Sequence, residues 1–144
     1  MTWSATLDTT NLTTNCARFV IPITYVATLT SAATKSFPRW QVPTGMTLIP
    51  LEVSLAHGSS ASGGTVKCEW IKGAATAIID QATAFETVAD DTAVTTTDFL
   101  ESSLSAGDTC FIKLTEATGG GGDTVTDFTI VITCKALLVD DTAP

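Results

Sequence analysis

Apolar and polar residues alternate along several segments of this chain. Between residues 21 and 30, isoleucine, tyrosine, alanine and leucine occupy every second position, and threonine occupies three of the positions between them, 24, 28 and 30. The same period of two recurs over residues 46–57, 65–72, 109–115 and 128–135. Such alternation places apolar side chains on one face of a half-buried strand. These five segments are therefore predicted to be β-strands.

Weaker patterns predict further strands and the turns between them. A strand is expected over residues 36–42, and a hairpin at Gly73 leads into a short strand over residues 76–80. Residues 82–89 fit either a short helix or an extended segment, whereas the β-branched residues 94–99 favour a strand. Glycine and serine between residues 57 and 64 predict a surface loop there.

About eight strands without a long helical period predict an all-β fold. Turn signals every 8–12 residues or so are typical of an antiparallel β-sandwich, here jelly-roll-like. Pro22 is expected near a sheet edge, because proline cannot donate a hydrogen bond to a neighbouring strand. We divide the chain into an extended N-terminal arm (1–18), the β-sandwich domain (19–139) and a polar C-terminal tail (140–144).

Composition supports strands and excludes some classes of partner. Threonine accounts for 28 of the 144 residues, and only 15% of the residues are charged. Threonine is both polar and β-branched, so it suits the solvent face of a sheet. The formal net charge of −8 leaves no basic surface for nucleic acid. No apolar run is long enough for a membrane-spanning helix, and the first residues show no secretory signal.

The titratable and thiol side chains do not form a recognisable catalytic or metal motif. Cys16, Cys68, Cys110 and Cys134 are widely spaced, and a single histidine accompanies them. We expect reduced cysteines, the last three acting as small apolar residues on strand faces. His57 is expected in a surface loop. We therefore predict no enzyme activity, no catalytic residue, no cofactor and no metal.

The arm supplies the candidate contact residues. Trp3, Leu7 and Leu12 are apolar residues in a segment without a core of its own, and such residues commonly need a partner surface. Packing on the parent domain is the alternative for them. Trp40 has a second interpretation, since an exposed tryptophan on a β-sandwich would favour carbohydrate binding.

Four segments resemble small jelly-roll modules of tailed-bacteriophage virion proteins. They are residues 42–49, which contain Val-Pro-Thr-Gly, residues 53–55, the hairpin at residues 63–73, and the Gly-Asp turn within residues 104–109. The likeness covers about residues 36–136. It implies capsid decoration (cement) proteins, head fibres or receptor-binding domains, commonly homotrimeric, and it implies no catalytic residues.

Among these roles the sequence favours capsid decoration, because the chain is one small domain with a short arm and no fibre repeat. The expected partner is a major capsid protein, contacted as a homotrimer on the capsid exterior after synthesis in the host cytoplasm. A phage fibre or receptor-binding module that recognises a host glycan is the alternative function.

Overall fold

The structure is a computed structural model that describes residues 16–30, 33–61, 66–79, 92–116 and 124–138. Within these ranges the regular secondary structure is entirely β-strand. The nine strands are β1 (Cys16–Thr30), β2 (Thr34–Ser36), β3 (Trp40–Gln41), β4 (Met46–Ala61), β5 (Val66–Lys72), β6 (Thr76–Ala77), β7 (Val94–Thr96), β8 (Thr109–Glu116) and β9 (Thr124–Leu138). No helix that could cross a membrane occurs in these ranges.

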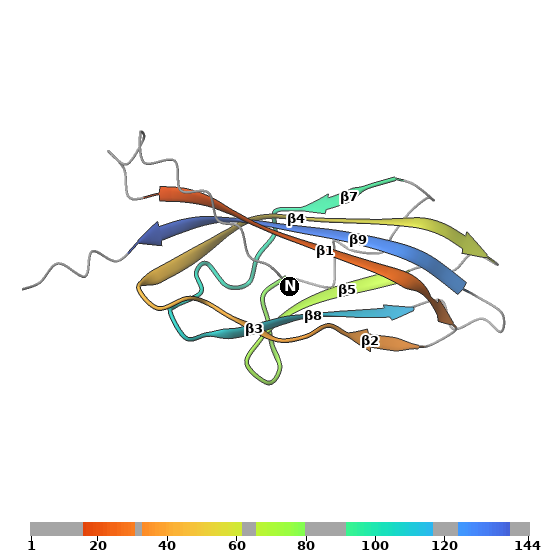
Figure 1. The fold of residues 1–144 in the computed structure, drawn as a ribbon, viewed down its shortest axis with the longest axis horizontal. Coiled ribbons are helices and arrows are strands. Elements are labelled where there is room, and N and C mark those ends of the chain that lie inside the picture. Colours follow the sequence, from red (N-terminus) through yellow and green to blue (C-terminus); the bar gives the residue numbers. More distant parts are fainter. Residues whose placement is uncertain (1–15, 31–32, 62–65, 80–91, 117–123, 139–144) are drawn as a thin grey trace, which may run out of the picture.

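The strands form two antiparallel sheets that face each other (Figure 1). Sheet A has the order β1-β9-β4-β7, and sheet B has the order β2-β8-β5-β6, with β3 also paired to β8. When β2 and β3 are counted as one interrupted strand, each sheet has four strands in the order of a jelly roll, and the chain changes sheet at every step except from β5 to β6. The predicted all-β sandwich is therefore confirmed.

Strand β9 organises sheet A, because the two other long strands both pair along it. Ile132 of β9 lies between Ile21 of β1 and Val53 of β4, and all three side chains are buried. Neighbouring positions on β9 alternate between the interior and the outer face, as the sequence period predicts. Pro22 lies on β1, an edge strand of sheet A, in agreement with its predicted position.

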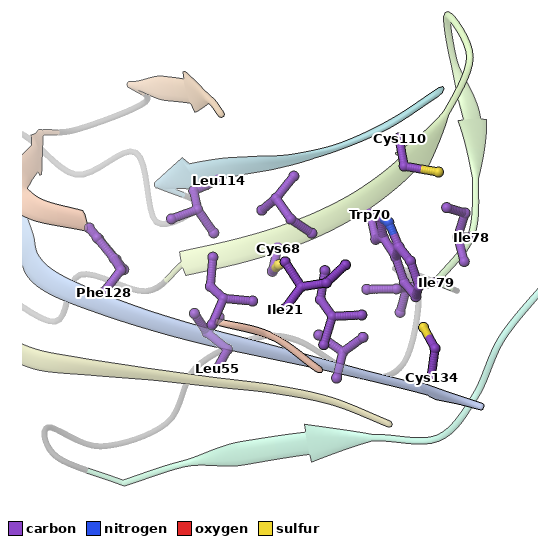
Figure 2. Packing of buried hydrophobic residues seen from close by; sticks show 14 of the residues in the cluster. Ile21, Leu55, Cys68, Trp70, Ile78, Ile79, Cys110, Leu114, Phe128 and Cys134 are labelled. Atoms are coloured by element: carbon purple, nitrogen blue, oxygen red, sulfur yellow. The ribbon is translucent and has the colours of Figure 1, made fainter. Parts of the chain in front are cut away.

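The core fills the space between the two sheets (Figure 2). Trp70 of β5 is fully buried, and its ring lies 6.3 Å from the ring of Trp40 and 6.3 Å from that of Phe99. Cys134 and Leu55 enter the same core from sheet A. The buried residues thus come from both sheets, as they do in a sandwich.

The predicted loop at residues 57–64 is wrong in its first half. Strand β4 continues to Ala61, because β9 supplies pairing partners as far as Thr124. His57 is therefore a strand residue opposite Phe128, and only 2% of its surface is exposed. The prediction that His57 lies in a surface loop is therefore wrong. The glycine and serine residues suggested a loop, but pairing with β9, a strand far along the chain, keeps this segment extended.

The predicted strand over residues 36–42 is interrupted. β2 ends at Ser36 and β3 begins at Trp40, with Pro38 between them. Proline has no backbone N–H and cannot continue the ladder with β8. Residues 82–89 lie outside the residues that the structure describes.

Candidate interaction surfaces

The predicted contact residues Trp3, Leu7 and Leu12 lie outside the described residues. The described chain begins at Cys16, where β1 already pairs with β9. Residues 16–18 belonged to the arm in the sequence-based division, yet they are part of a strand. Because residues 16–18 pair with β9, the predicted arm joins the sandwich at the start of the edge strand β1.

Four large apolar side chains of the described residues are exposed. Val26 is 84% exposed and Val20 48%, and both lie on β1. Leu100 is 59% exposed, and its backbone N–H donates to the carbonyl of Ile78 next to β6. Leu51, 41% exposed, marks a register shift in β4. Three of the four therefore lie along the two edges of the sandwich.

One edge of the sandwich is formed by β1 and β2, which we call the basic edge. Residues 16–45 contain Arg18, Lys35 and Arg39 and no aspartate or glutamate. Arg18 pairs with Lys135 of β9 on the outer face of sheet A, so a second cation stands beside it. The nearest acid on the adjacent strand, Asp127, packs against Gly58 of β4.

Aromatic residues support the cation of β2. The Tyr25 ring meets Phe37 edge-to-face at 5.4 Å and stacks on Phe128 at 6.2 Å. The Lys35 ammonium lies 5.2 Å from the centre of the Tyr25 ring. A cation over an aromatic face is held by the ring quadrupole. The arrangement therefore fixes a positive charge where β1 meets β2.

The opposite edge is formed by β6, β7 and residues 97–101, which we call the acidic edge. The bridge between Ile79 and Phe99 joins the two sheets there. Asp98 is exposed, and its backbone N–H donates to the Thr96 hydroxyl. Residues 76–101 contain six acids and no lysine or arginine. Four of these acids belong to residues 80–91, which lie outside the described residues.

One carboxylate of the acidic edge is already neutralised. Glu101 accepts a hydrogen bond from Lys72 of β5 in a salt bridge. This hydrogen bond raises the pKa of Lys72 above its ordinary value. Asp98 shows no salt bridge among the described residues, so its charge is available to a partner.

Two cations on the outer face of sheet B, Lys113 and Arg39, have partners within the chain. Lys113 of β8 forms a salt bridge with Glu69 of β5 at 2.5 Å. The Arg39 guanidinium covers the ring of Phe111, with 4.2 Å between its Cζ and the ring centre, and its Nη1 donates to the Gly73 carbonyl. Both side chains are thus held in place by groups of sheet B and its hairpin.

Trp40 does not form an exposed aromatic platform. Its side chain is half-buried and packs against the core, and its Nε1 is buried without a hydrogen-bond partner. The large apolar residues exposed within the described ranges are all aliphatic. Trp40 therefore lacks the exposed position that would have favoured carbohydrate binding.

Three cysteine thiols are buried and poorly reactive. Cys68, Cys110 and Cys134 are free and buried, as the alternation predicted. Burial raises the pKa of each of these thiols to about 12. Because the thiolate is the reactive form, these side chains are poor nucleophiles at neutral pH. No cluster of three or more metal-ligating side chains occurs in the described ranges.

Comparison with known proteins gives matches in structure alone. No family model and no curated protein matches the sequence. A chain in the structure of infectious bursal disease virus Gx strain matches with a TM-score of 0.52 and 10% identity over 90% of the present chain. The present chain spans about a third of that one, with 33% covered. At this identity the likeness shows that the two chains share a fold.

Two further structures are similar at lower scores. The Gt strain of the same virus gives a TM-score of 0.46 and 11% identity, with 88% of this chain and 33% of that chain covered. The cyanophage Pam1 capsid asymmetric unit gives 0.46 and 18%, with 86% and 85% covered. At these identities the likeness concerns the fold.

The two charged edges were not identified from the sequence, although their signal is present in it. A count of charge sign along the chain finds the acid-free residues 16–45 and the base-free residues 76–101. The strand order is needed to place β1 and β2 at one edge of the sandwich and β6 and β7 at the other.

Proposed function

We propose that this chain is a non-enzymatic virion structural protein, specifically a capsid decoration (cement) protein that binds the outer surface of a phage head as a homotrimer. The observation that carries the proposal is the jelly-roll strand order, together with its likeness to a chain in the structure of a virus. The poorly reactive buried thiols and the Lys113–Glu69 salt bridge are also in keeping with a structural role.

The mechanism is mechanical. Subunits lie across junctions between copies of a major capsid protein, and the arm residues Trp3, Leu7 and Leu12 are buried on that surface. A tryptophan covers roughly 150–250 Å². At about 25 cal/mol per Å², its burial contributes about 4–6 kcal/mol before ordering costs. Several arms acting together raise the free energy needed to separate neighbouring capsid proteins.

Co-sedimentation tests the proposal and the role of the arm together. The probe is a capsid of the virus that encodes this chain, assembled without it. The full chain is expected to bind saturably, and a chain lacking residues 1–15 is expected to remain in the supernatant. The deletion stops before Cys16 so that the pairing of β1 with β9 is kept.

A full-length variant provides the matched control. Trp3→Ala/Leu7→Ala/Leu12→Ala is expected to behave like the deletion, whereas Thr6→Ala/Thr10→Ala/Thr13→Ala should bind like the unmodified chain. Binding by the truncated chain would overturn the role of the arm. A folded full chain that does not bind the capsid, but binds a host glycan, would replace decoration with receptor binding.

A further inference from the structure

The two sheets differ in how they treat the apolar residues of their outer faces. On sheet B, Phe111 and Ile71 lie opposite each other and point outward, yet each is only 7% exposed. The Arg39 guanidinium covers the Phe111 ring. On sheet A, Val20 and Val26 are left 48% and 84% exposed. The chain therefore covers outward apolar residues on sheet B and leaves them open on sheet A.

These two valines belong to a larger surface, the outer face of β1, β9 and β4, which we call the sheet A face. The three strands lie side by side (Figure 1). Val20 of β1 pairs with Thr133 of β9, which pairs in turn with Glu52 of β4. Leu51, 41% exposed, is the neighbour of Glu52. Three of the four large apolar residues exposed in the described ranges therefore lie on this face.

Charge is sparse on the sheet A face. Residues 20–30 of β1 include no charged residue, and the paired parts of β9 and β4 add only Asp127 and Glu52. Hydroxyl and apolar side chains fill other outward positions, among them Pro22, Thr24, Thr129 and Val131. Depletion of charge is typical of the centre of a protein interface, and exposed apolar patches mark such interfaces. This face thus has the composition of a contact surface.

Backbone irregularities in three strands meet at Val26. β1 shifts register between Tyr25 and Thr28, which places Val26 level with Asp127 of β9. Asp127 has φ of 58°, and Gly58 of β4 lies directly against it. Strained backbone concentrates at functional sites, where the surrounding structure enforces it. Val26 is also β-branched, so it loses little rotamer freedom when a partner covers it.

We infer that the sheet A face lies against the major capsid protein, with Val20, Val26 and Leu51 as its apolar contacts and with sheet B turned away from the shell. This inference rests on the proposed function and adds to it the orientation of the sandwich. The capsid surface that fits is apolar and uncharged, because the sheet A face offers little charge to pair. The arm joins the sandwich at Cys16 of β1, so a partner held by the arm lies beside the same sheet.

The size of the sheet A face accounts for the need for an arm. Three strands about 4.8 Å apart and roughly eleven residues long, at about 3.3 Å per residue, cover roughly 500 Å². Stable complexes bury about 800 Å² on each partner. The face alone falls short of this area, and burial of Trp3 adds roughly 150–250 Å². The arm and the sheet A face are therefore expected to bind together.

Co-sedimentation with capsids of the encoding virus, assembled without the chain, tests this orientation. Val20→Asp/Val26→Asp is expected to weaken binding at least about tenfold, because each carboxylate would be buried against an apolar surface. Val26→Leu keeps the apolar contact and should bind like the unmodified chain. Binding should not weaken as salt is raised, since salt screens charges and this contact has few. A tenfold loss of binding in salt would contradict an apolar contact.

A double variant away from sheet A provides the matched control. Ser36→Asp/Leu100→Asp adds the same charge at one position on β2 of sheet B and at one apolar residue, 59% exposed, that lies outside both sheets. It should bind capsids like the unmodified chain. Circular dichroism would confirm that each variant is folded.

Hydroxyl-radical footprinting of the unmodified chain gives a second readout that needs no substitution. Val20, Val26 and Leu51 should lose reactivity when the chain is bound to capsids, whereas Leu100 should keep the reactivity that it has in the free chain. Mass spectrometry of the digested chain would measure the reactivity of each residue.

The outcomes separate this inference from the proposed function. A full chain that binds capsids would keep the decoration role but overturn the inference if Val20→Asp/Val26→Asp binds equally well, or if the residues of the sheet A face stay reactive on the capsid. A full chain that does not bind would reject both. Loss of reactivity on this face as the chain is concentrated, before any capsid is added, would show that a second copy covers it and would overturn the inference.

Discussion

Gly58 of β4 lies directly against Asp127 of β9: a Cβ added to Gly58 would lie 3.1 Å from the Cβ of Asp127. Asp127 has φ of 58°, a left-handed conformation that costs most residues free energy. The left-handed conformation of Asp127 on β9 is thus accommodated by the missing side chain on the neighbouring strand. This pair explains why β4 carries glycine within a strand.

The Gly58–Asp127 contact predicts a coupled effect on stability. Gly58→Ala alone should lower the free energy of unfolding, because the added methyl group crowds Asp127. In an Asp127→Gly background the same change should raise it by about 0.5–1 kcal/mol, since alanine restricts the unfolded chain more than glycine. Denaturant unfolding of the four chains measures the coupling. Additive effects, within about 0.5 kcal/mol, would contradict the contact.

The contacts of Arg39 predict a contribution of this side chain to the free energy of unfolding. Its guanidinium covers Phe111, which points outward from sheet B and yet is only 7% exposed. Arg39→Ala should lower the free energy of unfolding by about 1 kcal/mol, because it uncovers the ring and removes the hydrogen bond to Gly73. Arg39→Lys should recover only part of this loss, because lysine keeps the positive charge but lacks the planar guanidinium that covers the ring. Equal stability of Arg39→Ala and the unmodified chain would reject the contribution.

The buried thiols predict a loss of stability in alkali. Their pKa is raised from 9.0 to about 12 in the folded chain, so the unfolded chain releases these protons first. The stabilising contribution is therefore complete below about pH 9 and declines as the pH rises towards 12. Cys134→Ala should make this decline shallower, by up to about 1.4 kcal/mol per pH unit. An unchanged slope would contradict burial of the thiol.

The same burial predicts slow modification. Alkylation at pH 8, mapped by mass spectrometry, should leave Cys68, Cys110 and Cys134 unmodified in the folded chain and modify them in denaturant. The reason is that burial excludes both the reagent and the thiolate form. Rapid modification of these three residues without denaturant would show that the core between the two sheets opens.

Much of the fold was predictable because burial imposes a period on the sequence. β5 and β8 each send every second residue into the core, and the alternation of Val66, Cys68 and Trp70 records this directly. The continuation of β4 beyond His57 was not predictable, since it depends on pairing with β9, about seventy residues away. The break at Pro38 could have been found from proline's missing N–H.

The candidate surfaces were less accessible to sequence analysis. The absence of acids from residues 16–45 can be read from the sequence, but it gains meaning only when β1 and β2 are placed at one edge. Exposure of Val26 agrees with the period of two, which places this residue on the same outer face as Thr24 and Thr28. The role of Trp3, Leu7 and Leu12 stays a prediction.

Capsid stability with and without the chain tests the proposed function most directly. Capsids of the encoding virus, assembled without the chain, would be heated alone and after saturation with it, and shell rupture would be followed by release of the packaged DNA. We expect the saturated capsids to rupture at a higher temperature, and this gain should vanish with the chain lacking residues 1–15. Saturated capsids that rupture at the same temperature as bare ones would contradict a decoration role.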